Sequence, residues 1–262
     1  MTLFRHELRQ NRTGLLIWTA AIGALIAVCI FLFPEMKEQM DAVSEMFASM
    51  GSFSAAFGMD KVGFGTLDGF YAVECGNILG IGGAFFAALI AVNALAKEEK
   101  NKTAEFLLTH PVSRTRVAAE KLCAVWAQLL EMNLTVYLIA LLSVLLTGEP
   151  LPLRALSLLH LAYLLLQFEL SGICFGLSAF LRRGGLGAGI GVATLLYFLN
   201  LIANITSRAD FLRYITPFAY ADGAQIVMNL RLDAGLVLLG MAVGIICAAV
   251  GCIHYRKKDI AS

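Results

Sequence analysis

Six long apolar stretches dominate the pattern of hydrophobic and polar positions along the chain. Four of them carry no charged residue, and each of the other two carries a single acid. A helix needs about 20 apolar residues to cross the ~30 Å hydrocarbon core of a bilayer. Backbone amides in lipid must be paired within the segment, and no alternating barrel pattern is present. We therefore predict six transmembrane helices, at approximately 14–33, 75–96, 122–147, 155–181, 184–207 and 234–253.

The overall composition supports this interpretation. Of the 262 residues, 59% are hydrophobic and 15% are charged, and the mean hydropathy is +0.76. A soluble domain is about 45–50% apolar and about 25% charged, so an ordinary cytosolic enzyme is excluded. The net charge of +1 gives no reason to expect nucleic acid as a partner. We predict an all-α integral membrane protein, with a single transmembrane domain over residues 1–262 and lipid as its surroundings.

Basic residues are unevenly distributed between the two sides of the membrane that the six predicted spans define. The ends and loops on one side hold 14 of the 20 lysines and arginines, and those on the other side hold 6. Cytoplasmic loops are enriched in Lys and Arg. We therefore expect a multi-pass protein of the cytoplasmic membrane with both termini in the cytoplasm, and an even number of spans agrees with this.

The N-terminal residues and the glycines add detail to the spans. Residues 1–13 predict an amphipathic helix at the cytoplasmic interface, with Leu3, Phe4 and Leu8 on a face opposite three arginines. Glycine pairs at small-xxx-small spacing let helix backbones approach closely. Such pairs occur in four spans, at Gly76 and Gly80, Gly172 and Gly176, Gly187 and Gly191, and Gly240 and Gly244.

Two longer segments lie on the predicted outer side. Residues 34–74 begin with methionines at helical spacing over 35–50, which predicts a packed helix rather than a cofactor site. The second half of this segment is rich in glycine and phenylalanine and predicts turns. Residues 208–233 mix apolar and polar positions around Pro217, and predict one or two short helices.

The cytoplasmic loop between the second and third spans, residues 97–122, has an internal order. Thr103 can cap a helix, and Glu105 lies in its first turn, where the helix dipole favours an acid. Pro111 ends that helix, and Ser113 can cap the next. Between Glu105 and Pro111, the apolar residues Phe106, Leu107 and Leu108 form a cluster with charged residues on both sides in the sequence. The pattern fits docking of a partner, with contact to the membrane surface as the alternative.

The stretch T-A-E-F-L-L-T-H-P-V-S-R, from Thr103 to Arg114, resembles the segment after the second span of type-2 ABC exporter permeases. That family often reads G-T-x-E-x-L-L-x-x-P-V-S-R with a lysine following, as Lys121 does here; Lys102 stands where the family often has glycine. The six-span plan and the start L-F-x-x-E-L are also similar. The resemblance implies a coupling helix that docks onto a cytoplasmic ATPase through Thr103, Glu105, Phe106, Leu107, Leu108, Pro111 and Arg114.

The same resemblance implies the assembly. It pairs the chain with a second permease subunit, as a homodimer or heterodimer, and with a dimer of ABC ATPase subunits that bind ATP and Mg. No G-x-x-x-x-G-K-[ST] motif is present, so we expect no cofactor on this chain. The function expected is that of the permease subunit of an ATP-driven exporter, without enzyme activity of its own.

Among the polar residues inside the predicted spans, two acids and two asparagines are candidates for a functional role. An acid within a membrane is a functional candidate, because its insertion costs at least about 2.5–3.5 kcal/mol. These residues can line a translocation path or fix helix packing: Glu131, Glu169, Asn200 and Asn204. The two glutamates also leave an alternative function open, an ATPase-independent secondary carrier. No metal motif of the H-E-x-x-H type and no G-x-S-x-G motif supports an enzyme or a metal site.

Overall fold

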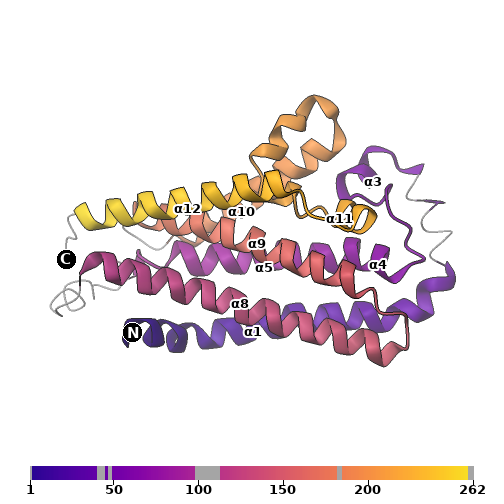
Figure 1. The fold of residues 1–262 in the computed structure, drawn as a ribbon, viewed down its shortest axis with the longest axis horizontal. Coiled ribbons are helices and arrows are strands. Elements are labelled where there is room, and N and C mark those ends of the chain that lie inside the picture. The colour runs from indigo at the N-terminus through magenta and orange to yellow at the C-terminus, as the bar shows by residue number, and fades with distance from the viewer. Residues whose placement is uncertain (1, 40–44, 47–48, 98–112, 182–184, 259–262) are drawn as a thin grey trace.

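The structure is a computed structural model, which describes residues 2–39, 45–46, 49–97, 113–181 and 185–258. Within these ranges it is a bundle of helices without strands (Figure 1). Six helices are long and apolar enough to cross a membrane. Five of them are α1 (Thr2–Met36), α8 (Arg114–Thr147), α9 (Leu153–Ser178), α10 (Leu186–Ile205) and α12 (Ala234–Lys257). The second span is the continuous run Leu67–Val92, whose main part is α5 (Gly76–Val92). The predicted all-α membrane fold is confirmed.

The chain begins and ends at the same end of this bundle (Figure 1), which we call the termini end. The connections at the opposite, far end contain short helical segments. They are η1 (Lys37–Gln39), α3 (Ser52–Phe57), α4 (Leu67–Phe70), η2 (Tyr71–Cys75), η3 (Ser207–Tyr214), η4 (Pro217–Ala219) and α11 (Gly223–Asn229). Short helices between the fifth and sixth spans are confirmed, and the described residues there form three helical segments where one or two were predicted.

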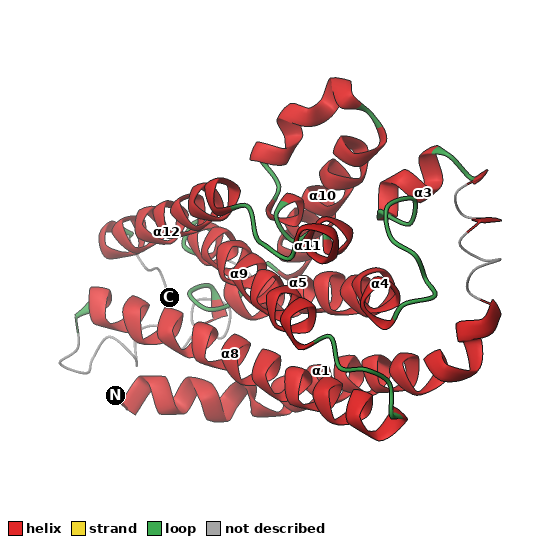
Figure 2. Ribbon diagram, turned by 45° about the vertical axis from the view of Figure 1, so that its right-hand side comes forward, coloured by secondary structure: helices red, strands yellow, loops and turns green. Residues whose placement is uncertain are grey.

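Helix α9 occupies the centre of the bundle. It packs against α5, α8 and α12, and it is the most buried of the six long helices (Figure 2). Helix α1 lies along α8 and buries one stripe against the core, which includes Ile26, Ile30 and Phe33. Most of the surface of α10 and α12 is exposed. An apolar exposed surface of this kind suits contact with lipid or with another membrane helix.

Glycine allows the close contact between α9 and α12. A Cβ atom added to Gly172 would clash with the backbone carbonyl of Gly244, and one added to Gly176 would clash with that of Cys247. Gly76 and Gly80 of α5 similarly give space to the ring of Tyr163. These predicted packing pairs are confirmed.

Gly187 and Gly191 of α10 behave differently. None of the described residues lies within 4 Å of a Cβ atom built on either residue, and both are exposed. This pair therefore takes no part in packing among the described helices, because α10 turns this face outward.

Two helices are longer than the apolar pattern predicts. Residues 2–13 form no separate interface helix and continue into the first span as the single helix α1, since no residue there interrupts the backbone hydrogen bonds. The predicted two faces are nevertheless present, with half-buried Leu3, Phe4 and Leu8 opposite exposed arginines. Helix α8 begins at Arg114 and not at 122, and the hydroxyl of Ser113 caps it by accepting from the amide of Arg116 at 3.3 Å.

The second span starts with an irregular turn. The segment η2 is a π-helix that precedes α5, and it holds Tyr71 in the core, where the Tyr71 hydroxyl and His160 Nε2 of α9 lie 2.7 Å apart. In the first outer segment, α1 extends to Met36, so the predicted helix over 35–50 does not begin as a new element. Met40, Val43 and Phe47 of the predicted stripe lie outside the described residues. Met36 and Met46 are 41% and 54% exposed, so the prediction that the stripe is packed is wrong for these two side chains.

Candidate functional site

The predicted coupling helix is not among the described residues. Of the residues assigned to it, Thr103, Glu105, Phe106, Leu107, Leu108 and Pro111 fall within 98–112, and the structure describes only Arg114. Arg114 is the first residue of α8, and its guanidinium donates hydrogen bonds to the backbone carbonyls of Arg256 and Lys258. It thereby ties the start of α8 to the end of α12.

One lysine before residues 98–112 and one lysine after them contact the same buried glutamate. We call this ionic cluster the Glu7 cluster (Glu7, Lys97 and Lys121). The ammonium of Lys121, which is fully buried, lies 2.9 Å from Glu7 Oε1 and donates to the carbonyl of Ala94 at 2.8 Å. The ammonium of Lys97 contacts Glu7 Oε2 and donates to Gln10 Oε1 at 2.8 Å. Each oxygen of one carboxylate thus holds one lysine.

The Glu7 cluster joins three helices at the termini end. Lys97 follows α5, Lys121 lies on the first turns of α8, and Glu7 belongs to α1. A buried charge is tolerated when it is paired and hydrogen-bonded. The cluster therefore fixes the chain on both sides of residues 98–112 to the N-terminal helix, and it borders a cavity with an empty volume of about 620 Å³.

Sequence reasoning missed this cluster, because it treated both lysines as surface charges of a cytoplasmic loop. One signal was present. Glu7 lies next to Leu8 and one helical turn from Leu3 and Phe4, on the apolar side of the N-terminal helix. An acid on that face requires a buried cation.

The two intramembrane glutamates lie in different surroundings. Glu169 is buried between α9 and α12, and its Oε2 accepts a hydrogen bond from the Tyr220 hydroxyl at 2.9 Å. A Cβ atom on Gly240 would clash with this carboxylate. Glu131 is exposed on the outer face of α8, beside exposed leucines such as Leu134. The contacts of Glu169 match the packing interpretation, and Glu131 is available to lipid or to a partner.

The two asparagines line a cavity near the far end, which we call the far-end cavity. Its empty volume is about 470 Å³, including the open side, and it lies between α5, α9, α10, α3 and the start of α11. Asn204 donates from Nδ2 to the carbonyl of Ala56 at 3.2 Å. Asn200 is 7% exposed, and its Oδ1 has no hydrogen-bond partner among the described residues.

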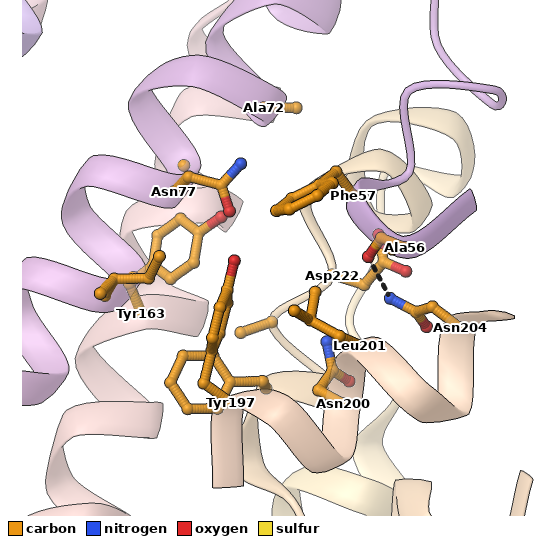
Figure 3. Close-up of a pocket in the computed structure, with 16 residues that line it drawn as sticks. Ala56, Phe57, Ala72, Asn77, Tyr163, Tyr197, Asn200, Leu201, Asn204 and Asp222 are labelled. Carbon is orange, nitrogen blue, oxygen red and sulfur yellow. Dashed lines mark hydrogen bonds between the residues drawn. The ribbon is translucent and has the colours of Figure 1, made fainter. Parts of the chain in front are cut away.

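Aromatic and polar side chains alternate around this cavity. Figure 3 shows the hydroxyls of Tyr163 and Tyr197 and the amide of Asn77 pointing into the same space, opposite the ring of Phe57. Asp222 also lines the cavity. The sequence offered no period or motif for this set, because its members come from five different elements.

No group of three or more His, Cys, Asp or Glu side chains in the described ranges is arranged to hold a metal ion.

Six helices long and apolar enough to cross a membrane define a multi-pass membrane protein. The chain belongs to the family described as multidrug efflux system permease Rv1217c, C-terminal domain, which it matches over residues 4–256. This confirms the membership expected from the resemblance and identifies a transport permease. No curated protein gives a match.

Proposed function

We propose that the chain is the permease subunit of an ATP-driven ABC exporter, which moves a substrate out across the cytoplasmic membrane. A separate ATPase dimer binds ATP and Mg and supplies the energy. The observation that carries this proposal is the match to an efflux permease family over residues 4–256 in a chain that also holds the segment T-A-E-F-L-L-T-H-P-V-S-R between α5 and α8.

The arrangement of basic residues supports the proposal that the termini end of the bundle faces the cytoplasm. The start of α1, the start of α8 and the end of α12 lie together there (Figure 1). These three helix ends contribute basic residues, which are Arg5, Arg9, Arg12, Arg114, Arg116, Lys121, Arg256, Lys257 and Lys258. Enrichment of Lys and Arg on one side is typical of the cytoplasmic side.

The Glu7 cluster supports a route for the mechanical coupling. In the proposal, ATP-driven closure of the ATPase pushes on residues 103–111. Because Lys97 and Lys121 hold both sides of this loop on Glu7, the displacement passes to α1, α5 and α8 as one unit. A packed unit of this kind shifts between discrete arrangements and does not deform continuously.

The exposed face of α10 supports a second permease subunit. Gly187 and Gly191 are separated by one helical turn and have free space around them, so another helix can approach their backbone closely. A second copy of this chain or a different permease chain can occupy this face. The substrate then moves through a cavity between the two subunits.

Replacing Glu105 and Phe106 together with Ala is expected to remove the ATPase from the purified complex. Loss of a buried aromatic anchor and a charged contact costs about 2 kcal/mol or more, so affinity falls more than about tenfold. Arg116→Ala serves as the control, since Arg116 is exposed on α8 and outside the docking segment. The readout is the amount of ATPase that copurifies and its stimulated activity. An ATPase that stays bound to the double variant and stays stimulated contradicts the proposal.

A further inference from the structure

We propose that the far-end cavity binds a small organic ammonium ion, with the carboxylate of Asp222 opposite its charge and aromatic rings around its alkyl groups. That this ion belongs to the class of substrate that the permease moves rests on the proposed function. The binding itself needs neither ATP nor the ATPase.

Asp222 supplies a buried carboxylate, one oxygen of which forms an ion pair with Lys61 but accepts no hydrogen bond among the described residues. Its side chain is 8% exposed, and Oδ1 caps α11 by accepting from the amide of Gln225 at 3.2 Å. Oδ2 is buried and has no hydrogen-bond partner within the described ranges. The nearest described cation is the ammonium of Lys61 at 3.7 Å, which is too far for a hydrogen bond. A buried carboxylate oxygen without a donor favours a cationic donor from a ligand.

The walls of the cavity suit the body of such an ion. Four aromatic rings line it, those of Phe57, Tyr163, Tyr197 and Phe218, and the last two pack edge to face at 5.3 Å between centroids. Ring faces attract ammonium groups through their quadrupole. This combination of rings and one carboxylate is selective for a cation over an anion.

A second acceptor limits the choice of ligand further. Asn200 is more than nine-tenths buried in the lining of the cavity, and its Oδ1 lacks a donor within the described residues. A ligand with a hydroxyl or N–H group in addition to its charge satisfies both Asn200 and Asp222.

Lys61 competes with the ligand for the same carboxylate oxygen. It lies in the connection between α3 and α4 and is 27% exposed, so its ammonium can return to solvent when a ligand enters. Removing the charge of Lys61 therefore strengthens binding. A purely structural ion pair between Lys61 and Asp222 predicts no such gain.

The test is equilibrium dialysis of radiolabelled choline with the purified chain in detergent, without ATPase or nucleotide. Wild type is expected to bind choline saturably, and uncharged 3,3-dimethylbutanol, which has the same shape, is expected not to displace it. Asp222→Asn keeps the helix cap, because Asn caps as well as Asp, and should weaken binding more than about tenfold. Lys61→Met should tighten binding by up to about fivefold.

Asp233→Asn is the matched control. Asp233 caps α12 by accepting from the amides of Gly235 and Leu236, at 2.9 and 3.2 Å, and lies outside the cavity. Its replacement should leave choline binding unchanged. If Asp222→Asn fails to fold, Lys61→Met and Tyr197→Leu, which is expected to weaken binding, still decide the question.

Several results overturn the proposal: no saturable binding, equal displacement by 3,3-dimethylbutanol, or no change in a folded Asp222→Asn variant. Equal loss in the Asp233→Asn control also overturns it. Failure here is distinguishable from failure of the proposed function, because copurification of the ATPase depends on residues 103–111 at the other end of the molecule.

Discussion

The Glu7→Gln variant is expected to lose about 3–5 kcal/mol of stability, the cost of leaving a buried charge without its partner. Glu7 holds two lysines, and the ammonium of Lys121 is completely buried. Glutamine keeps the shape of the side chain and removes the charge, so Lys121 and Lys97 both lose the ion pair with Glu7. The measurement is the unfolding of the purified chain in detergent, followed by thermal melting or by titration with a denaturing detergent.

Glu149→Gln is the control for this variant. Glu149 pairs with Lys37 at 2.9 Å near the far end, and the Lys37 side chain is 46% exposed. A pair in contact with solvent contributes about 0–1 kcal/mol. An equal loss of stability in the two variants would show that burial of the Glu7 cluster has no special weight and would remove it from the coupling mechanism.

Replacing both Gly172 and Gly176 with Ala is expected to separate α9 from α12 and to lower stability strongly. The added methyl groups meet backbone carbonyl groups of α12, which cannot rotate away as side chains do. Overpacking costs about 1–3 kcal/mol per site even where side chains can adjust. The variant should show lower expression in the membrane and a lower melting temperature.

The matched control places alanine at Gly187 and Gly191 of α10. No atom of the part of the chain that the structure describes lies within 4 Å of the added methyl groups, and alanine is the better helix former. The isolated chain should therefore fold as well as wild type. A comparable loss at these two positions would mean that helix flexibility, and not contact between α9 and α12, explains the effect of the first variant.

The hydrophobic pattern is sufficient to predict the six long helices, because the need to pair backbone amides in lipid leaves the helix as the one solution for such stretches. Helix ends are less predictable. The apolar stretch marks where lipid begins, whereas α8 begins earlier, at the cap formed by Ser113, and includes charged residues such as Arg116. The π-helix at Tyr71–Cys75 has no signal in the hydrophobic pattern, and its Tyr71 contacts His160 of a helix far along the chain.

The candidate sites were predictable only in part. Asn200 and Asn204 stand out as polar residues in an apolar stretch, and the structure places both in the lining of the far-end cavity. Their neighbours Asp222 and Tyr163 could not be connected with them, because contacts between elements far apart in sequence leave no periodic pattern. The Glu7 cluster also joins residues far apart in sequence, and these contacts leave no periodic pattern. Glu131 and Glu169 are each the single acid of an apolar stretch, and only the structure shows that Glu169 is buried and Glu131 exposed.

The central claim is that residues 103–111 dock onto a separate ATPase, and photo-crosslinking in intact membranes tests it most directly. A photoreactive phenylalanine analogue replaces Phe106, and the same analogue at Phe211, which is 62% exposed in η3 at the far end, is the control. We expect position 106 to form a crosslink to a protein that mass spectrometry identifies as carrying G-x-x-x-x-G-K-[ST], and position 211 to form none. Crosslinks from position 106 to lipid alone would contradict the account and favour a carrier that works without an ATPase.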